Sequence, residues 1–315
     1  MLAGRPQLRM LTLCLIAAGG PRPVAVPPGS GSDTAPGQGA IPVRLAFSEK
    51  VVNGVNLSDA RAAMGVWADE VLKSEELKVT LAPGQNWVMT TDKLLGAIRG
   101  GTVDLFCLSV QEYRQVVPYV DATRIVTNDM GGEEFLLVVR EGAGIMRLGD
   151  LRGRSLILQD SSNTILAEPW LAVALWREGL DSPDRLMARI STNTKVSKVV
   201  LPVFFGQADA CVVTRRGLDT MAELNPQVAR KLKILLVSPK MESTIIACRK
   251  GYPAQFKERL FERILALRQT AAAQQALVLF QSHGFAEQDA SCLKSAFELL
   301  DEYERHNELG TTRKR

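Results

Sequence analysis

Hydrophobic and polar positions alternate most clearly over residues 151–176. Residues 155–158 form a short apolar run bounded by polar residues, which predicts a buried strand. Apolar residues then recur at helical spacing over 170–175, which predicts a helix. The small polar residues 161–164 lie between the two. A helix start leaves backbone N–H groups unpaired at the positive end of the helix dipole, so this loop either caps the helix or holds an anion.

The chain before this stretch alternates predicted strands with predicted helices. Apolar runs predict strands over residues 43–47, 77–81 and 103–108. One helix is predicted to end near residue 73, and another to run from about residue 88 to Gly100 and Gly101. Strands that alternate with helices in this way imply a parallel sheet with helices on its faces.

The alternation then breaks and resumes. Residues 124–127 and 134–140 are strand-like with no helix between them, and residues 141–144 form a flexible joint. A second alternating series follows, with strands predicted over residues 155–158, 187–190, 208–213 and 232–237. One more strand is predicted over 244–249, and continuous helix is predicted over 253–307.

Two segments repeat one local pattern. GTVD before residue 105 and GQAD before residue 210 each follow a predicted helix and precede a short strand and a polar loop. This echo favours two lobes of similar construction. In open parallel sheets, ligands bind beyond the carboxyl ends of strands, so a cleft between the lobes would bring together four loops: residues 48–56, 109–113, 161–164 and 214–216.

The amino terminus predicts export. Residues 1–20 carry two arginines, then an apolar run and two glycines, which is the order of a secretory signal peptide. Lipid anchoring at Cys14 is disfavoured, because a lipoprotein cysteine follows a small residue and Leu13 stands there. Residues 21–40 are rich in Pro, Gly, Ser and Ala, which predicts a disordered linker. We therefore expect the protein in the periplasm.

Composition and charge narrow the function. The chain has 315 residues, 46% hydrophobic and 23% charged, which is typical of a globular protein of about two domains. A net charge of +4 is too small to indicate nucleic-acid binding. His283 and His306 lie far in sequence from other ligand clusters, so we expect neither a metal nor another cofactor. The remaining cysteines lack metal-binding spacing and are expected to be free thiols, buried in strands for the first three: Cys107, Cys211, Cys248 and Cys292.

Five features occur together in this sequence: a secretory signal, the turn LGDLRG before a strand, a Ser/Thr loop that opens a helix, the GxxD strand start, and an SP segment that returns the chain to its first lobe. Together they resemble the PhnD-like substrate-binding proteins of ABC importers, which take up phosphonates, phosphite and related oxyanions. The resemblance covers residues 41–280. It implies an α/β fold of the type 2 periplasmic-binding-protein class, with two lobes, each a mostly parallel sheet flanked by helices, and a helical C-terminal segment.

The same resemblance implies how the lobes share the chain. We expect residues 41–140 to form the first part of the first lobe, and 141–238 to form the second lobe. Residues 239–315 then return to the first lobe and end in the C-terminal helices. Two crossover strands would act as a hinge.

The resemblance also implies a binding loop. In phosphonate binders of this family the oxyanion lies on a Ser-Thr-Ser-Gly helix start, which aligns with Ser162, Asn163, Thr164 and Ile165, just after Ser161. Asn163 here replaces a hydroxyl, and Ile165 replaces a glycine whose lack of a side chain lets backbone approach ligand. The alternative for Ser162 and Thr164 is that they only cap the helix.

Four further residues are candidates for ligand contact. The family tyrosine of the helix-opening loop matches Tyr113, in the loop that begins at Ser109. The acidic residue that in some members faces a ligand amine matches Asp209, and Lys195 lies at another predicted helix start. Each has a structural alternative, and for Ser109 it is to cap the helix that follows. Tyr113 would pack on its own helix, Asp209 would fix the turn before its strand, and Lys195 would be a solvated helix start.

The leading hypothesis is a monomeric periplasmic receptor that closes on a small polar, anionic solute and presents it to an ABC permease in the inner membrane. An alternative is a ligand-sensing subunit whose closed, ligand-bound form binds a membrane signalling receptor. Catalysis on the same scaffold is disfavoured, because the sequence shows no clustered histidines, no metal-ligand spacing and no Ser-x-Gly nucleophile turn.

Overall fold

The computed structural model describes residues 41–72, 79–81, 87–271 and 284–312, with the single residues 273, 274, 277 and 282. The expectations of a signal peptide over 1–20, of a linker over 21–40 and of no anchor at Cys14 lie outside these residues, as does His283. No helix within the described ranges is both long and apolar enough to cross a membrane.

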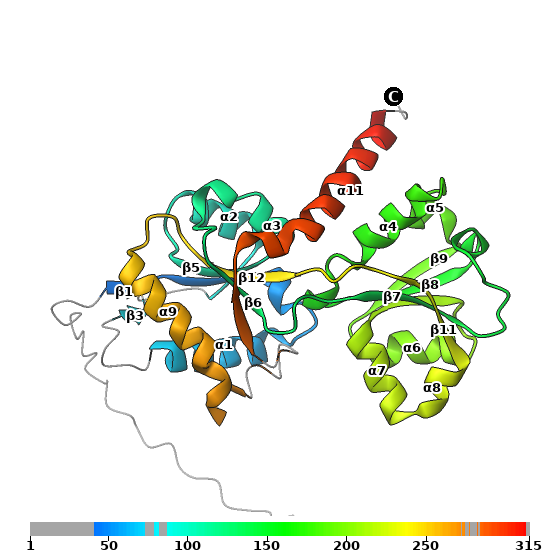
Figure 1. The fold of residues 1–315 in the computed structure, drawn as a ribbon, viewed down its shortest axis with the longest axis horizontal. Coiled ribbons are helices and arrows are strands. Elements are labelled where there is room, and N and C mark those ends of the chain that lie inside the picture. Colours follow the sequence, from blue (N-terminus) through cyan, green and yellow to red (C-terminus); the bar gives the residue numbers. More distant parts are fainter. Residues whose placement is uncertain are drawn as a thin grey trace, which may run out of the picture. The chain divides into compact units, whose positions relative to one another are not determined.

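The first lobe is built on a six-stranded sheet (Figure 1). Its strands are β2 (Leu45–Ser48), β4 (Val88–Met89), β5 (Leu105–Ser109), β6 (Ile125–Asn128), β12 (Thr244–Cys248) and β13 (Phe285–Gln288), in the order β13-β6-β12-β5-β2-β4. β2 pairs in parallel with β4 and β5, whereas the pairings β12 with β5 and β6, and β13 with β6, are antiparallel. A separate parallel pair joins β1 (Ile41–Val43) to β3 (Val79–Leu81).

Helices cover both faces of this sheet, because alternate strand residues point to opposite sides. Phe47, Val126 and Ile246 pack with α1 (Leu57–Leu72) and α9 (Ala254–Ala266). Phe106 and Ile245 face α2 (Thr91–Arg99) and α3 (Val110–Arg114) on the other side. Short 3-10 turns complete the lobe: η1 (Glu49–Val52), η2 (Val117–Tyr119) and η5 (Leu267–Gln269).

The second lobe is built on a five-stranded sheet. Its strands are β7 (Phe135–Arg140), β8 (Ser155–Gln159), β9 (Arg189–Asn193), β10 (Ala210–Thr214) and β11 (Leu232–Val237), in the order β11-β7-β10-β8-β9. The flanking helices are α4 (Ala167–Arg177), α5 (Pro183–Leu186), α6 (Val196–Phe204), α7 (Arg215–Leu224) and α8 (Pro226–Lys231), with the 3-10 turns η3 (Leu148–Leu151) and η4 (Ser162–Thr164).

The predicted two-lobe α/β fold is confirmed, but both sheets are mixed and not mostly parallel as expected. In the second lobe, β8 is parallel to β9 and β10, and β7 is antiparallel to β10 and β11. Parallel pairing thus occurs where strands alternate with helices, and antiparallel pairing where the strands next to the crossovers join each sheet. β7 lies in the second sheet, so the first crossover precedes Phe135 and does not follow Arg140 as the boundary at residue 140 implied.

Two crossovers connect the lobes and touch each other. Residues 129–134 link β6 to β7, and 238–243 link β11 to β12. The N–H of Glu133 donates to the carbonyl of Met241 at 2.8 Å, and the reverse bond is 2.9 Å. Gly132 has a φ of +87°, and a Cβ there would lie 2.8 Å from the Met241 carbonyl carbon, so only glycine fits this approach.

Two local predictions are wrong. Val88 and Met89 form β4 on the edge of the first sheet, so the helix predicted from residue 88 begins at Thr91. The helix predicted over 253–307 is interrupted by β13, which pairs with β6, and the Arg124 side chain bonds to Glu287 of β13. Both strands are short and occupy sheet edges, where pairing with a neighbour overrides a weak local pattern.

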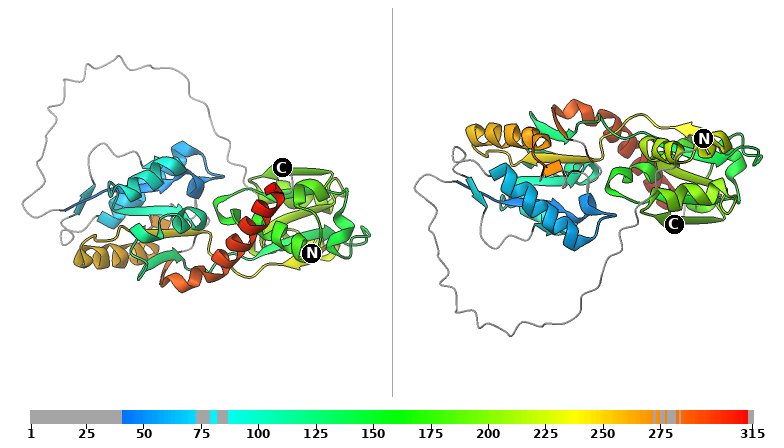
Figure 2. Two further views of the ribbon diagram at one scale, coloured as in Figure 1. Left: turned by 90° about the horizontal axis from the view of Figure 1, so that it is seen from above. Right: turned by 90° about the horizontal axis from the view of Figure 1, so that it is seen from below.

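The C-terminal helix α11 (Lys294–Thr312) follows the 3-10 turn η6 (Ala290–Leu293) and contacts both lobes (Figure 2). Asp301 of α11 pairs with Arg114 of α3 at 2.5 Å. Glu302 pairs with Arg177 of α4 at 2.6 Å, and His306 stacks on Trp176 at 4.8 Å between ring centroids. The helical C-terminal segment therefore also ties the first lobe to the second.

The cysteines in the described residues are free thiols, as predicted. Cys107, Cys211 and Cys248 lie in β5, β10 and β12. Burial raises the pKa of Cys211 to about 12, so this thiol stays protonated at neutral pH.

Candidate functional site

The predicted binding loop forms the 3-10 turn η4, stabilised by two of its own hydroxyls. Thr164 Oγ1 donates to the Gln159 carbonyl at 2.8 Å and accepts from the Ser161 N–H at 2.9 Å. Helix α4 begins only at Ala167, and its N-cap residue Leu166 has no side-chain cap. The expectation that Ser162 or Thr164 caps the helix is therefore wrong, because a separate turn precedes α4. Ser161 and Thr164 hold that turn together.

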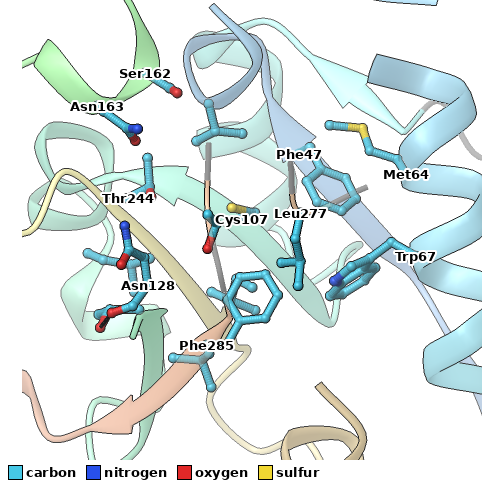
Figure 3. Close-up of a pocket in the computed structure, with 16 residues that line it drawn as sticks. Phe47, Met64, Trp67, Cys107, Asn128, Ser162, Asn163, Thr244, Leu277 and Phe285 are labelled. Carbon is cyan, nitrogen blue, oxygen red and sulfur yellow. Dashed lines mark hydrogen bonds between the residues drawn. The ribbon is translucent and has the colours of Figure 1, made fainter. Parts of the chain in front are cut away.

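The other two loop residues face the first lobe. Ser162 and Asn163 line a pocket whose remaining walls come mainly from the first lobe (Figure 3). The Ser162 N–H donates to the Asn53 carbonyl at 3.3 Å, and Ser243 Oγ donates to the Asn163 carbonyl at 3.1 Å. Asn53 also donates through its side chain to Asp160 at 2.6 Å. The structure thus brings together two of the polar loops predicted to line a cleft, residues 48–56 and 161–164.

The floor of the pocket is a row of side chains across four strands. The strand register places Phe47 beside Cys107, Cys107 beside Ile246, and Ile246 beside Val126. Residues directly opposite on neighbouring strands project from one face of a sheet, so these four side chains form a continuous apolar surface. All four line the pocket.

The same register places a polar pair at the end of the pocket next to η4, which we call the mouth. Thr244 lies two residues before Ile246, and Asn128 lies two residues after Val126, so on antiparallel strands they share the face of the floor. Both line the pocket, beside Ser162 and Asn163 (Figure 3). The Asn128 side-chain oxygen accepts from the Met130 N–H at 2.7 Å, which leaves its amide group as the donor.

Aromatic and thioether side chains close the opposite end. Met64 and Trp67 project from α1, whereas Phe285 of β13 lies opposite Asn128 in the strand register (Figure 3). The Trp67 ring meets Phe47 edge to face, with 5.6 Å between ring centroids. The pocket is therefore polar where the second lobe meets it and apolar beneath α1.

Ser109 does not line this pocket. It is fully buried, and Glu112, itself 1% exposed, folds back over it. The carboxylate of Glu112 accepts hydrogen bonds from Ser48 Oγ at 2.6 Å, Thr91 Oγ1 at 2.7 Å, Ser109 Oγ at 2.8 Å and the Ser109 N–H at 2.9 Å. Sequence reasoning missed Glu112, although the spacing Ser-x-x-Glu at the start of α3 is that of a capping box.

Tyr113 packs inside the protein, against another helix and not on its own as the structural alternative stated. Its side chain is 1% exposed and packs against Phe297 of α11, with ring centroids 6.3 Å apart. Burial raises the pKa of Tyr113, and its hydroxyl has no hydrogen-bond partner among the residues that the structure describes. It is absent from the described lining of the pocket.

Asp209 lies at the wrong end of its strand for a ligand contact. It precedes β10 and accepts hydrogen bonds from Ser155 Oγ at 2.6 Å and from the Ser155 N–H at 2.9 Å, with Arg154 at 3.3 Å. Asp104 does the same before β5, where the Arg44 N–H and guanidinium bind it at 3.1 and 2.7 Å. The two aspartates of the GxxD echo therefore tie the starts of neighbouring strands together, at the edge opposite the pocket mouth.

We expect Asp209→Ala to lower stability and leave ligand affinity unchanged. The substitution removes the acceptor of two hydrogen bonds from Ser155, which together contribute about 1–3 kcal/mol. A urea titration measures the loss, and calorimetric titration of the folded variant measures affinity. If the variant has the stability of the parent but binds ligand more weakly, Asp209 contacts the ligand and this assignment is wrong.

The cations predicted at the strand ends are exposed or paired. Lys195 is exposed at the start of α6, where its N–H donates to the Asn193 side chain at 3.0 Å, and it is outside the described lining of the pocket. Arg215 and Arg216, at the start of α7, form ion pairs with Glu134 and Glu133 of the first crossover. Within the described ranges, no group of three or more His, Cys, Asp or Glu residues could hold a metal ion.

Comparison with known proteins identifies the same architecture. Three solved structures share the fold: a Xanthomonas citri protein bound to chloride (16% identity, TM-score 0.58, covering 84% of this chain and 99% of that one), a binding protein component of an ABC phosphonate transporter from Pseudomonas aeruginosa (14%, 0.54, 85% and 88%), and PhnD1 from Prochlorococcus marinus in complex with methylphosphonate (13%, 0.52, 87% and 98%). The comparison with curated protein sequences gives no significant match.

A family model described as "ABC transporter, phosphonate, periplasmic substrate-binding protein" matches residues 60–293. The match begins within α1 and ends with η6, and so includes the second sheet, the first sheet without β2, and the pocket floor without Phe47. Members of this family bind substrates for transport and are not enzymes. The chain therefore belongs to the family of periplasmic substrate-binding proteins of phosphonate ABC transporters.

Proposed function

We propose that this protein is the periplasmic receptor of an ABC importer and closes on a small solute with an oxyanion group. One observation carries the proposal: Ser162 and Asn163, at the positions of the family's oxyanion loop, line the same pocket as Asn128 and Thr244 of the first lobe. A ligand held at this point contacts both lobes. Its binding energy then favours the closed arrangement over the open one.

The polar end of the pocket supplies donors for an oxyanion. Within the described chain, no hydrogen bond engages the hydroxyls of Ser162 and Thr244, and the amides of Asn128 and Asn163 add N–H groups. Hydrogen bonds to a charged acceptor contribute about 1.5–3 kcal/mol each. Two of the structural relatives hold anions, methylphosphonate in one and chloride in the other, which supports an anionic group for this ligand.

The crossovers suit a hinge. They comprise only residues 129–134 and 238–243, so few covalent links join the lobes. Closure around ligand would present a single surface, made of both lobes, to the permease in the inner membrane.

Serine substitutions at adjacent positions test the proposal. We expect Ser162→Ala to lower the affinity for methylphosphonate at least about tenfold, because a charge-assisted hydrogen bond is lost. Ser161→Ala is the matched control: its hydroxyl contacts Thr164 at 3.2 Å inside the turn, so stability falls and affinity stays. Calorimetric titration and melting curves of both variants give the two quantities.

Equal affinity of Ser162→Ala and parent for methylphosphonate, phosphite and phosphate would contradict the assignment of the oxyanion to η4. Failure of the parent to bind any phosphonate, phosphite, phosphate or sulfonate would contradict the proposed ligand class.

A further inference from the structure

The pocket has far more apolar wall than an inorganic oxyanion needs. The hydroxyls of two polar lining residues, Thr127 and Ser282, donate to backbone carbonyls. The other four polar side chains gather at the mouth: Ser162, Asn163, Asn128 and Thr244 (Figure 3). Beneath them lie the apolar floor and the side chains of α1. The described residues that line the pocket include no charged side chain.

Several polar groups of the neighbouring loops are already bound within the protein. Arg215 and Arg216 are paired with crossover carboxylates. The hydroxyls of Ser48 and Ser109, at the carboxyl ends of β2 and β5, donate to the buried carboxylate of Glu112. An anion beside Glu112 would meet a negative charge where it needs donors.

We propose that the ligand is an oxyanion that carries an apolar substituent of about the size of a phenyl ring. The oxyanion lies at the mouth, as in the proposed function on which this inference rests, and the substituent lies on the row formed by Phe47, Cys107 and Ile246, against Trp67. A flat ring on this floor meets the edge or face of Trp67, the geometry that Phe47 already adopts with the same indole.

The size of the substituent follows from the walls. A methyl group at the mouth would leave the side chain of Trp67 without ligand contact, because it lies at the opposite end of the pocket, beneath α1. Burial of apolar ligand surface against these walls is favourable in proportion to the area removed from water. The pocket should therefore select for the substituent, while the loop selects for the oxyanion.

Calorimetric titration with three compounds tests the inference on the unmodified protein. Phenylphosphonate has both parts, methylphosphonate lacks the ring, and benzenesulfonamide carries the ring on an uncharged tetrahedral group. We expect phenylphosphonate to bind about thirtyfold tighter than methylphosphonate, which corresponds to about 2 kcal/mol for burial of the ring. Benzenesulfonamide should bind more weakly than phenylphosphonate.

A pair of cysteine substitutions locates the ring. Cys107 lies in the middle of the floor, so Cys107→Met should fill the space and lower the affinity for phenylphosphonate at least about tenfold, with methylphosphonate unchanged. Cys292→Met makes the same change at a thiol of similar exposure outside the described lining, and should leave both affinities unchanged. Melting curves establish that both variants are folded. If Cys107→Met does not fold, the ligand comparison on the parent decides alone.

The outcomes separate this inference from the proposed function. Methylphosphonate binding as tightly as phenylphosphonate would overturn the apolar substituent and leave the oxyanion receptor standing. Benzenesulfonamide binding as tightly as phenylphosphonate would retain the apolar substituent and overturn the oxyanion. Failure of both ring compounds to bind would overturn the inference outright.

Discussion

Arg216→Met is expected to destabilise the protein by about 3 kcal/mol, because it leaves a buried carboxylate without its cation. The Glu133 side chain is 8% exposed and forms an ion pair with the Arg216 guanidinium, which is 27% exposed. Burial raises the pKa of Glu133, and Arg216 acts against that rise. Methionine keeps most of the aliphatic length of arginine, so the loss measures the charge. Urea denaturation of parent and variant gives the difference.

Two further variants make this result specific. Arg152→Met removes the cation of an exposed pair with Asp181, in which the charges are 3.1 Å apart, and should cost less than about 1 kcal/mol. Glu133→Gln placed in the Arg216→Met background should recover part of the loss, since the unpaired charge is gone. If Arg216→Met costs no more than Arg152→Met, the crossover pair does not contribute to stability as we infer.

Glu242→Gln should change how stability depends on pH. Glu242 is 5% exposed in the second crossover, and burial raises its pKa to about 7 from an ordinary value of 4.5. A hydrogen bond with Thr127 opposes this rise, and the Glu133 carboxylate adds to it. The folded protein therefore holds this proton more tightly than the unfolded chain does. The stability it contributes is complete below pH 4.5 and is lost as the pH rises through 7.

Glutamine at position 242 is uncharged at every pH, so the variant should not lose this stability as the pH rises. The free energy of unfolding of Glu242→Gln, relative to the parent, should rise by about 3 kcal/mol between pH 4.5 and pH 8. Glu298→Gln is the control, because it makes the same substitution at an exposed side chain. A flat difference for Glu242→Gln would mean that Glu242 titrates near its ordinary pKa in the folded protein.

The apolar runs of the sequence were sufficient to locate most strands. Residues 232–237 were predicted as a strand and form β11 with these bounds. The strands predicted over 134–140 and 155–158 form β7 and β8, and their observed bounds differ from the predicted ones by one residue. The run of β7 is reliable because a strand covered on both faces must be apolar at consecutive positions. β11 is an edge strand and only partly buried, but its apolar run is long enough to be recognised. The edge strands β4 and β13 lack this constraint, since one neighbour is enough to form them.

The motifs of the sequence identified the family and two of the residues that face the pocket. Ser162 and Asn163 were found because a short polar loop between a buried strand and a helix is a local pattern. The same reasoning selected Ser161 and Thr164, whose hydroxyls turn inward to hold η4. The family resemblance selected Asp209, because a turn aspartate before a strand and a ligand-facing aspartate have the same neighbours in sequence.

By itself, then, the sequence determined the alternation of strands and helices, the two lobes and the binding loop, all of which depend on neighbouring residues. Only the tertiary structure decided what the loop faces. The floor joins Phe47, Cys107, Val126 and Ile246, which lie up to 199 positions apart in sequence and meet through strand register. The carboxylates of Glu112 and Glu133 likewise bind residues that are distant in the chain: Glu112 accepts a hydrogen bond from Ser48, and Glu133 pairs with Arg216. Burial and charge pairing of this kind depend on which strands become neighbours, and no local pattern records that choice.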